Sequence, residues 1–248
     1  MKISTLNKRR LNNFISNKRG LYSFVIFTFL FIVSIFADFI ANDKPLLVKY
    51  NSGFYFPIFK SYSETVFGGD FETEADYRDP FVKDLIDSKG WFIMPIIPYS
   101  YDTIIRDINA PVPSPPSQYN WLGTDDQARD VLARLIYGFR ISILFGFSLT
   151  FLSMIIGVSA GAIQGYFGGK TDLFFQRFME IWSAVPTLYV LIILASVIQP
   201  NFWWLLIILL LFSWMGYVGV VRAEFLRARN FDYIRAAKAL GVSTTKII

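Results

Sequence analysis

The run from Gly165 to Thr171 comes closest to a motif that performs chemistry, because it reads Gly-Tyr-Phe-Gly-Gly-Lys-Thr. A Gly-x-x-x-x-Gly-Lys-Ser/Thr loop that follows a strand binds the phosphates of ATP. Such a loop ending at Lys170 and Thr171 needs glycine at position 164, where this chain has Gln164, and this run follows a long apolar segment instead of a strand. A turn explains the glycines better, with Thr171 or Asp172 capping the next helix. We therefore expect that the chain does not hydrolyse ATP itself.

Two residue types that carry much enzyme chemistry do not occur in the sequence, which has no His and no Cys. Their absence excludes thiolate chemistry, disulfides, Ser-His-Asp triads and nearly every zinc site. Four acidic residues could form a cation site or a carboxylate pair, but their spacing matches no ligand pattern, so we interpret them as solvated surface charge: Glu72, Glu74, Asp76 and Asp79. We expect no catalytic residue, no metal ligand and no cofactor site, and the chain is predicted not to be an enzyme.

Long uncharged apolar runs dominate the chain. It is 54% hydrophobic with a mean hydropathy of +0.42, and a membrane-spanning helix needs roughly 20 apolar residues. These features predict a polytopic, all-α integral membrane protein with a long extracytoplasmic loop. Gln199-Pro200-Asn201 divides the last apolar run into a hairpin. The predicted transmembrane helices are residues 21–41, 141–163, 181–198 and 202–221.

The first apolar run could alternatively be a cleaved signal peptide. The run is long for that purpose, and Ala37-Asp38-Phe39 does not fit an Ala-x-Ala cleavage site. We therefore predict an uncleaved anchor.

Charge sets the predicted orientation in the membrane. Residues 1–20 form a basic leader with six Lys and Arg and no acid, residues 42–140 carry 10 basic and 14 acidic side chains, and residues 222–248 carry 6 basic and 2 acidic ones. By the positive-inside rule the leader and the last segment are cytoplasmic. A sequence pI near 9.3 would also suit a nucleic-acid partner. The basic residues flank the spans, however, so we expect a membrane lipid environment and no nucleic acid.

The segments between the spans also have predicted structures. Residues 42–123 should form a folded or half-folded extracytoplasmic loop, in which the proline-rich stretch 111–117 is extended. Residues 124–127, Thr-Asp-Asp-Gln, match a capping box, so an amphipathic helix should cover residues 124–140. This helix lies either in the membrane interface or packed on the loop. Residues 164–180 should form a cytoplasmic turn and the start of the third helix, which Pro186 kinks.

Glycines recur every four residues within the second predicted span, at Gly157, Gly161 and Gly165. Such a repeat leaves a smooth helix face that another helix can approach closely. We therefore predict helix packing at this face. A specific dimerisation motif is the sharper alternative.

The most specific pattern follows the fourth span directly: Asp232-Tyr233-Ile234-Arg235-Ala236-Ala237-Lys238-Ala239-Leu240-Gly241. It resembles the EAA loop of binding-protein-dependent ABC importer permeases, in which two alanines precede a glycine four residues after the second. Small residues let a short helix enter a cleft on a partner, and Gly241 permits either close approach or a left-handed turn that ends the helix. An ordinary basic helix is the alternative, but the position after a span favours the EAA loop.

Two further stretches are similar to the oligopeptide and dipeptide branch of that family. The stretch from Trp121 to Gly138 resembles its signature before the second span, and Gly165 to Asp172 resembles its first cytoplasmic turn. The long loop is most similar to the microcin C and oligopeptide permease subgroup. Together these matches cover nearly the whole chain. Arg235 stands in the place of the glutamate that names the EAA loop, and the family pattern continues into two further spans beyond Ile248.

The resemblance implies a permease subunit that moves peptides or peptide-like solutes by ATP-driven alternating access. The permease domain would cover about residues 140–248 and be incomplete, and residues 222–248 would be the ATPase-coupling segment. The implied coupling residues are Asp232, Ala236, Ala237, Ala239, Leu240 and Gly241. The implied partners are a second permease subunit, cytoplasmic ABC ATPase subunits and an extracytoplasmic solute-binding protein. The alternative is a split or truncated remnant that acts only as a membrane interaction protein. The sequence names no substrate-binding residue.

Overall fold

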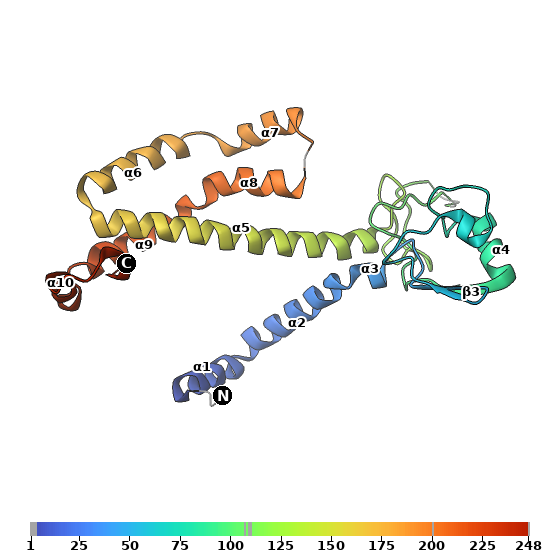
Figure 1. Cartoon of the computed structure of the whole chain (residues 1–248), viewed down its shortest axis with the longest axis horizontal. Helices are drawn as coiled ribbons and strands as arrows, with labels where there is room; N and C mark the ends of the chain where they lie inside the picture. Colours follow the sequence, from blue (N-terminus) through green and yellow to red (C-terminus); the bar gives the residue numbers. More distant parts are fainter. Residues whose placement is uncertain (1–3, 107, 109–110, 200, 248) are drawn as a thin grey trace. The chain divides into compact units, whose positions relative to one another are not determined.

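The computed structural model describes residues 4–106, 108, 111–199 and 201–247. Lys2 of the basic leader and Pro200 of the predicted hairpin turn therefore lie outside the described residues. The chain forms two compact units, Met1–Ile143 and Leu144–Ile248, and each is described by itself (Figure 1).

The first unit begins with three helices, α1 (Thr5–Ser16), α2 (Lys18–Ile35) and α3 (Ala37–Ile40). Asn17 separates α1 from α2 and caps α2, because its Oδ1 accepts a hydrogen bond from the Gly20 backbone N–H at 3.3 Å. Most large apolar side chains of α2 are exposed, as expected of a helix whose surroundings are lipid. Helix α2 is one of three helices in the described part of the chain that are long and apolar enough to cross a membrane.

Residues 42–130, which we name the loop domain, contain a small sheet that the sequence analysis did not predict. Strands β1 (Leu47–Tyr50), β2 (Gly53–Tyr55) and β3 (Gly90–Ile93) pair antiparallel in the order β2-β1-β3. The 3-10 helix η1 (Glu64–Phe67) and helix α4 (Pro80–Lys89) complete the fold. Asp79 caps α4, because its Oδ1 accepts a hydrogen bond from the Phe81 N–H at 2.9 Å. Pro80 occupies the first turn of α4, where a backbone N–H would have no partner within the helix, so proline loses no hydrogen bond there. The core of this part is Val48, Tyr50, Phe67, Ala75, Tyr77, Val82 and Ile86.

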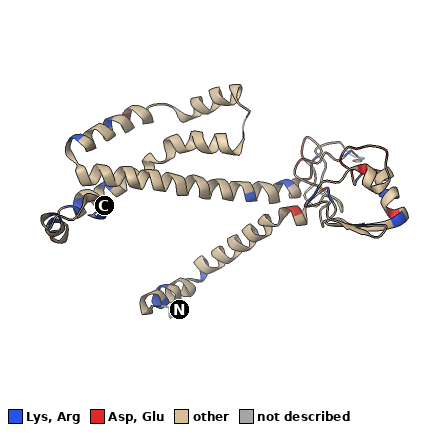
Figure 2. Cartoon of the chain, in the orientation of Figure 1, with Lys and Arg blue, Asp and Glu red and all other residues tan. Residues whose placement is uncertain are grey.

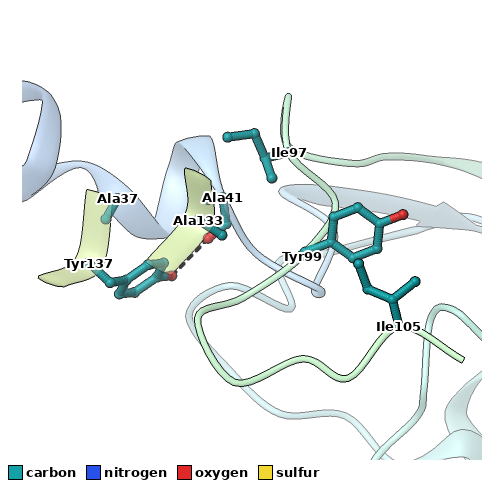
Figure 3. Close-up of a cluster of buried hydrophobic side chains, with 7 residues drawn as sticks. All are labelled: Ala37, Ala41, Ile97, Tyr99, Ile105, Ala133 and Tyr137. Carbon is teal, nitrogen blue, oxygen red and sulfur yellow. Dashed lines mark hydrogen bonds between the residues drawn. The ribbon is translucent and has the colours of Figure 1, made fainter. Parts of the chain in front are cut away.

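A second core joins the end of the first span to the start of a long helix, α5 (Val131–Phe167). Figure 3 shows its buried side chains, to which α3, the loop domain and α5 all contribute. The Tyr137 hydroxyl lies 2.8 Å from Ala41 O and 2.9 Å from Asp38 Oδ1. Arg140 of α5 pairs with Asp38 Oδ2 at 2.7 Å. Polar and apolar contacts therefore fix the loop domain to the first turns of α5.

The predicted capping box is wrong, and so is the predicted helix start. Residues 124–130 are not helical, and the Thr124 hydroxyl lies 2.8 Å from Ser114 Oγ instead of capping a helix. Asp130 takes the capping position, since its Oδ1 accepts from the Ala133 N–H at 2.8 Å. Leu132 and Ile136, two apolar residues of the predicted amphipathic helix, pack on the second core. Leu135 of the same helix is 57% exposed, so only part of this face packs on the loop domain.

The boundaries of the predicted second to fourth spans also change. One 37-residue helix, α5, includes the whole of residues 141–163 and extends beyond them at both ends. The chain turns at Gly168, after which α6 (Gly169–Ser183) and α7 (Thr187–Val197) meet at an angle of 61° around Pro186. Residues 181–198 are therefore not one straight helix, because proline at position 186 cannot continue the ladder of α6.

The last apolar run forms α8 (Phe202–Ser213) and α9 (Met215–Ala228), and α10 (Asp232–Ala239) and α11 (Thr244–Ile247) follow. Figure 1 shows α7 and α8 side by side and running in opposite directions. Phe145 of α5 packs edge-to-face on Phe202 of α8, with 5.4 Å between the ring centroids. Figure 2 shows no Lys, Arg, Asp or Glu on α7 and α8. Residues 18–35, 131–167 and 202–228 each qualify as a span, and α6 with α7 qualifies as a bent fourth. The fold is thus that of an all-α polytopic membrane protein with a mixed domain inserted in one loop.

Candidate coupling site

Three residues separate the end of α9 from the start of helix α10. Asp232 occupies its first turn and Lys238 its last, so both charges suit the helix dipole. Gly241 adopts φ +76°, the Gly241 N–H donates to Lys238 O at 3.0 Å, and the Val242 N–H donates to Ala237 O at 3.1 Å. This pair of bonds is the Schellman arrangement that ends helices. Of the two roles that the sequence left open for Gly241, the structure therefore shows the left-handed turn.

The residues expected to contact an ATPase lie on the outside of the second unit. Ala237 is half-buried, whereas Asp232, Ala236, Ala239, Leu240 and Gly241 are exposed. Leu240 is 84% exposed and Tyr233 is 65% exposed. A Leu and a Tyr side chain beside small alanines form an apolar surface that a partner can cover.

One contact ties α10 to the end of α5. The Lys238 ammonium lies over the ring of Tyr166, 4.4 Å from its centroid. A cation above an aromatic face is attracted by the negative charge of that face. Neither residue was singled out for this pairing by the sequence analysis, because 72 positions separate them in the chain and no periodicity links them.

A bidentate ion pair holds the start of α6 to α9. Arg222 donates from Nε to Asp172 Oδ1 at 2.5 Å and from Nη2 to Oδ2 at 2.6 Å. The two side chains are only 15% (Asp172) and 28% (Arg222) exposed, and the amide of Gln176 lies within 2.6 Å of Nη2. The sequence suggested Asp172 as a possible helix cap, but its carboxylate instead accepts hydrogen bonds from Arg222, 50 positions away. Helix α6 begins after Gly168 without a side-chain cap.

The turn between α5 and α6 also contacts Arg229. The Arg229 guanidinium donates to Gly165 O at 3.4 Å and occupies the space that a Cβ at Gly168 would need. Gly168 has φ +61° and Gly169 has φ +54°, a region where residues with a Cβ are strained. Glycine is therefore required at position 168 for two separate reasons, the backbone conformation and the arginine beside it.

The glycine repeat of α5 faces the backbone of the last span. A Cβ at Gly157 would lie 2.8 Å from Tyr217 Cβ, one at Gly161 would lie 2.9 Å from Val218 O, and one at Gly165 would lie 2.5 Å from Phe225 Cβ. Real Cβ contacts are wider than this, so only hydrogen fits at these positions. Beside the glycine face, Ser153 and Ser213 join α5 to the end of α8 by a 2.5 Å hydrogen bond. The structure brings the three glycines together on one interface within this chain.

A cavity of about 610 Å³ in the loop domain is bordered by three of the four acidic residues considered in the sequence. Glu74 pairs with Lys44 at 2.5 Å, Asp76 accepts from the Arg78 N–H, and Asp79 caps α4. Glu72 does not border the cavity. These local bonds occupy the carboxylates, and the described residues contain no group of three or more residues placed to hold a metal ion.

Residues 153–248 match the family model described as the binding-protein-dependent transport system inner membrane component. The chain is 56% identical over 247 residues to the inner membrane ABC transporter permease protein YejE of Escherichia coli, covering 100% of this chain and 72% of that protein. It is 51% identical to the peptidoglycan transport system permease protein YejE of Agrobacterium fabrum, covering 99% of this chain and 70% of the relative.

More distant relatives point to the same class of protein. The chain is 34% identical over 168 residues to the oligopeptide transport system permease protein OppC of Haemophilus influenzae, covering 68% of this chain and 52% of that protein. The family model and these relatives describe permease subunits of the inner membrane, not enzymes. With apolar helices suited to crossing a bilayer and high identity along its whole length, the chain belongs to the binding-protein-dependent ABC transporter permeases, a family of multi-pass inner membrane proteins.

Proposed function

We propose that this permease subunit imports peptides or peptide-like solutes by alternating access, driven by ATP that separate cytoplasmic subunits hydrolyse. The relatives named for oligopeptide and peptidoglycan transport support this substrate class. A second permease subunit completes the pathway, a partner that membership of the binding-protein-dependent family implies. The observation that carries the proposal is the exposed helix α10, which directly follows the last span and has the alanines and glycine of an EAA loop.

The orientation of the chain follows from its charges. The basic leader and the basic segment after α9 lie in the cytoplasm, and the loop domain, whose acids outnumber its bases, lies on the outer side. In this orientation α10 faces the ATPase subunits, where its small side chains enter a cleft and Leu240 supplies apolar contact. The loop domain then faces an extracytoplasmic solute-binding protein, which delivers the substrate.

The experiment is purification of the complex after a bulky side chain has been placed on α10. Ala236→Trp should release the ATPase subunits and abolish uptake of a labelled oligopeptide, because an indole cannot enter a cleft shaped for alanine. Lys8→Trp on α1 is the matched control, since it adds the same bulk at an exposed position outside the coupling segment, and it should retain both the ATPase subunits and uptake.

The second candidate is a membrane interaction protein without transport activity. It predicts that no ATPase subunit co-purifies with the wild-type chain and that Ala236→Trp changes nothing. The high identity to transport permeases along the whole chain favours transport over this alternative.

A further inference from the structure

The turn between α5 and α6 is the one place in the described part of the second unit where contacts from α9 and α10 converge on α5 and α6. Asp172 pairs with Arg222, Gly165 O accepts from Arg229, and Tyr166 lies under Lys238. We name these six residues the turn clasp. We propose that the turn clasp transmits movement of α10 to α5 and α6, and that Asp172 and Arg222 are the positioning residues that make the connection rigid. This inference rests on the proposed function of α10 in ATPase coupling.

The backbone by itself cannot make this connection rigid. Gly168 and Gly169 both have positive φ and lack side chains that would hold a conformation, and glycine allows more backbone freedom than any other residue. A displacement of α5 would therefore be absorbed at the turn before it reached α6. A second link across the turn is needed if α6 is to follow α5.

The Asp172–Arg222 pair has the properties of such a link. Two parallel hydrogen bonds fix both the distance and the angle between the planar groups, which a single-point contact of a lysine would not do. Both side chains are largely shielded from water, so the pair is weakly screened, and removing one partner leaves the other charge uncompensated. The pair joins the first turn of α6 to the last two turns of α9.

Helix α9 is in turn tightly joined to both α5 and α10. Its backbone meets Gly157, Gly161 and Gly165 so closely that a Cβ cannot be inserted, and packed helices in such contact move together. Only Arg229, Asn230 and Phe231 separate α9 from α10, and the Lys238–Tyr166 contact adds a second attachment. A tilt of α10 thus reaches α5 through α9 and Tyr166, and it reaches the first turn of α6 through Arg222 and Asp172. The far end of α6 is held separately, because Trp182 donates to Leu211 O of α8 at 3.0 Å.

The test uses the full complex with its ATPase subunits and solute-binding protein in liposomes. The readout is labelled oligopeptide taken up per ATP hydrolysed, a ratio that a loss of assembled protein does not change. Asp172→Asn and Arg222→Gln should lower this ratio about tenfold while hydrolysis continues. The exchanged pair Asp172→Arg with Arg222→Asp should restore it. Arg177→Gln is the control, because Arg177 pairs with Glu180 on its own helix at an exposed site, and it should leave the ratio unchanged.

The outcomes separate failure of this inference from failure of the proposed function. A wild-type complex without peptide uptake contradicts the proposed function. Uptake by the wild type together with an unchanged ratio in Asp172→Asn, or an exchanged pair that assembles but stays uncoupled, overturns the role of the turn clasp. If the single variants do not assemble, Arg222→Lys decides, since it keeps the charge and loses the two-point geometry. A wild-type ratio in Arg222→Lys overturns the inference, and a lowered ratio supports it.

Discussion

Single side chains, or their absence, decide how the helices of the second unit meet. The glycine repeat of α5 was readable from the sequence because its period of four residues matches a helix face, and the structure places all three glycines against α9. The Asp172–Arg222 and Tyr166–Lys238 contacts could not be predicted from a repeat in the sequence. Their members lie 50 or more positions apart, and local pattern carries no information about which distant residue a charge will meet.

Gly161→Ala should destabilise the second unit by about 1–3 kcal/mol, because the added methyl group would lie 2.9 Å from both Val218 O and Val221 Cβ. Gly146→Ala is the matched control on the same helix, since nothing lies within 4 Å of a Cβ there, and it should be neutral or stabilise by up to ~1 kcal/mol. The thermal unfolding midpoint of the detergent-solubilised protein measures both. Equal midpoints for the two variants would contradict the close packing at Gly161.

Asp130→Ala should destabilise the junction of the loop domain and α5 by about 1–2 kcal/mol, because Asp130 caps the helix. The substitution also removes the acceptor of the buried Asn120 side chain, which donates to Asp130 Oδ2 at 2.8 Å. Asp126→Ala, at an exposed neighbouring position, should have little effect. Denaturant titration of the two variants compares them, and a larger loss for Asp126→Ala would show that the helix is capped elsewhere.

Acid should weaken the loop domain through Asp125. Burial favours the neutral carboxyl, but hydrogen bonds from Arg129, the Gln127 backbone and Arg134 outweigh it and hold the pKa of Asp125 well below its usual range. A depressed folded pKa stabilises the fold above the unfolded value, near pH 4, and this contribution is lost as the pH falls through the folded value. Asp125→Asn should therefore be less stable than the wild type at pH 7, and the difference should shrink below about pH 4. Unfolding curves by near-ultraviolet circular dichroism at several pH values test this, and a difference that is constant with pH would contradict it.

At the scale of elements, the apolar spans were predictable and their ends were not. Uncharged runs long enough to cross a bilayer identify α2, α5 and α8 with α9, because few other structures need so many consecutive apolar residues. The prediction of a capping box at residues 124–127 was wrong because the Thr124 hydroxyl forms a hydrogen bond with Ser114, ten positions away in the sequence. Asp130 caps α5 instead. The sheet of the loop domain escaped prediction because its strands are only three or four residues long, too short to show an alternating pattern.

Helix α5 should extend beyond the membrane at its first turns. Its 37 residues measure about 55 Å at 1.5 Å each, and the hydrocarbon core is only about 30 Å thick. Because the sequence has no cysteine, single-cysteine labelling is clean. Leu135→Cys, at a position 57% exposed, should react with a water-soluble maleimide, and Ala133→Cys, at a fully buried position, should not. An unreactive Leu135→Cys in the folded protein would place these turns in lipid.

At the scale of the whole molecule, function depends on what meets this chain. The chain covers 72% and 70% of the two most extensively matched relatives described above. The sequence identity to these relatives establishes the family of the chain. Proposals about its binding partners depend instead on the side chains that its helices expose. We propose that the exposed face of α10 binds ATPase subunits, and that the exposed apolar side chains of α7 and α8 contact lipid and a second permease. Sequence could place α10 after the last span, but only the structure shows that Leu240 lies on the outside while Lys238 fastens the helix to Tyr166.

Docking of α10 on an ATPase subunit is tested by photo-crosslinking from position 240 of the full chain in its own membrane. A photoreactive amino acid replaces Leu240, and the adduct is identified by mass spectrometry and tested for ATP binding. The same amino acid at Leu135, in the first turns of α5, is the control. If α10 docks on an ATPase subunit, position 240 yields an adduct with an ATP-binding ABC subunit and position 135 does not. Adducts with lipid alone at position 240, or an ATPase adduct from position 135 and none from position 240, would contradict docking of α10 on the ATPase.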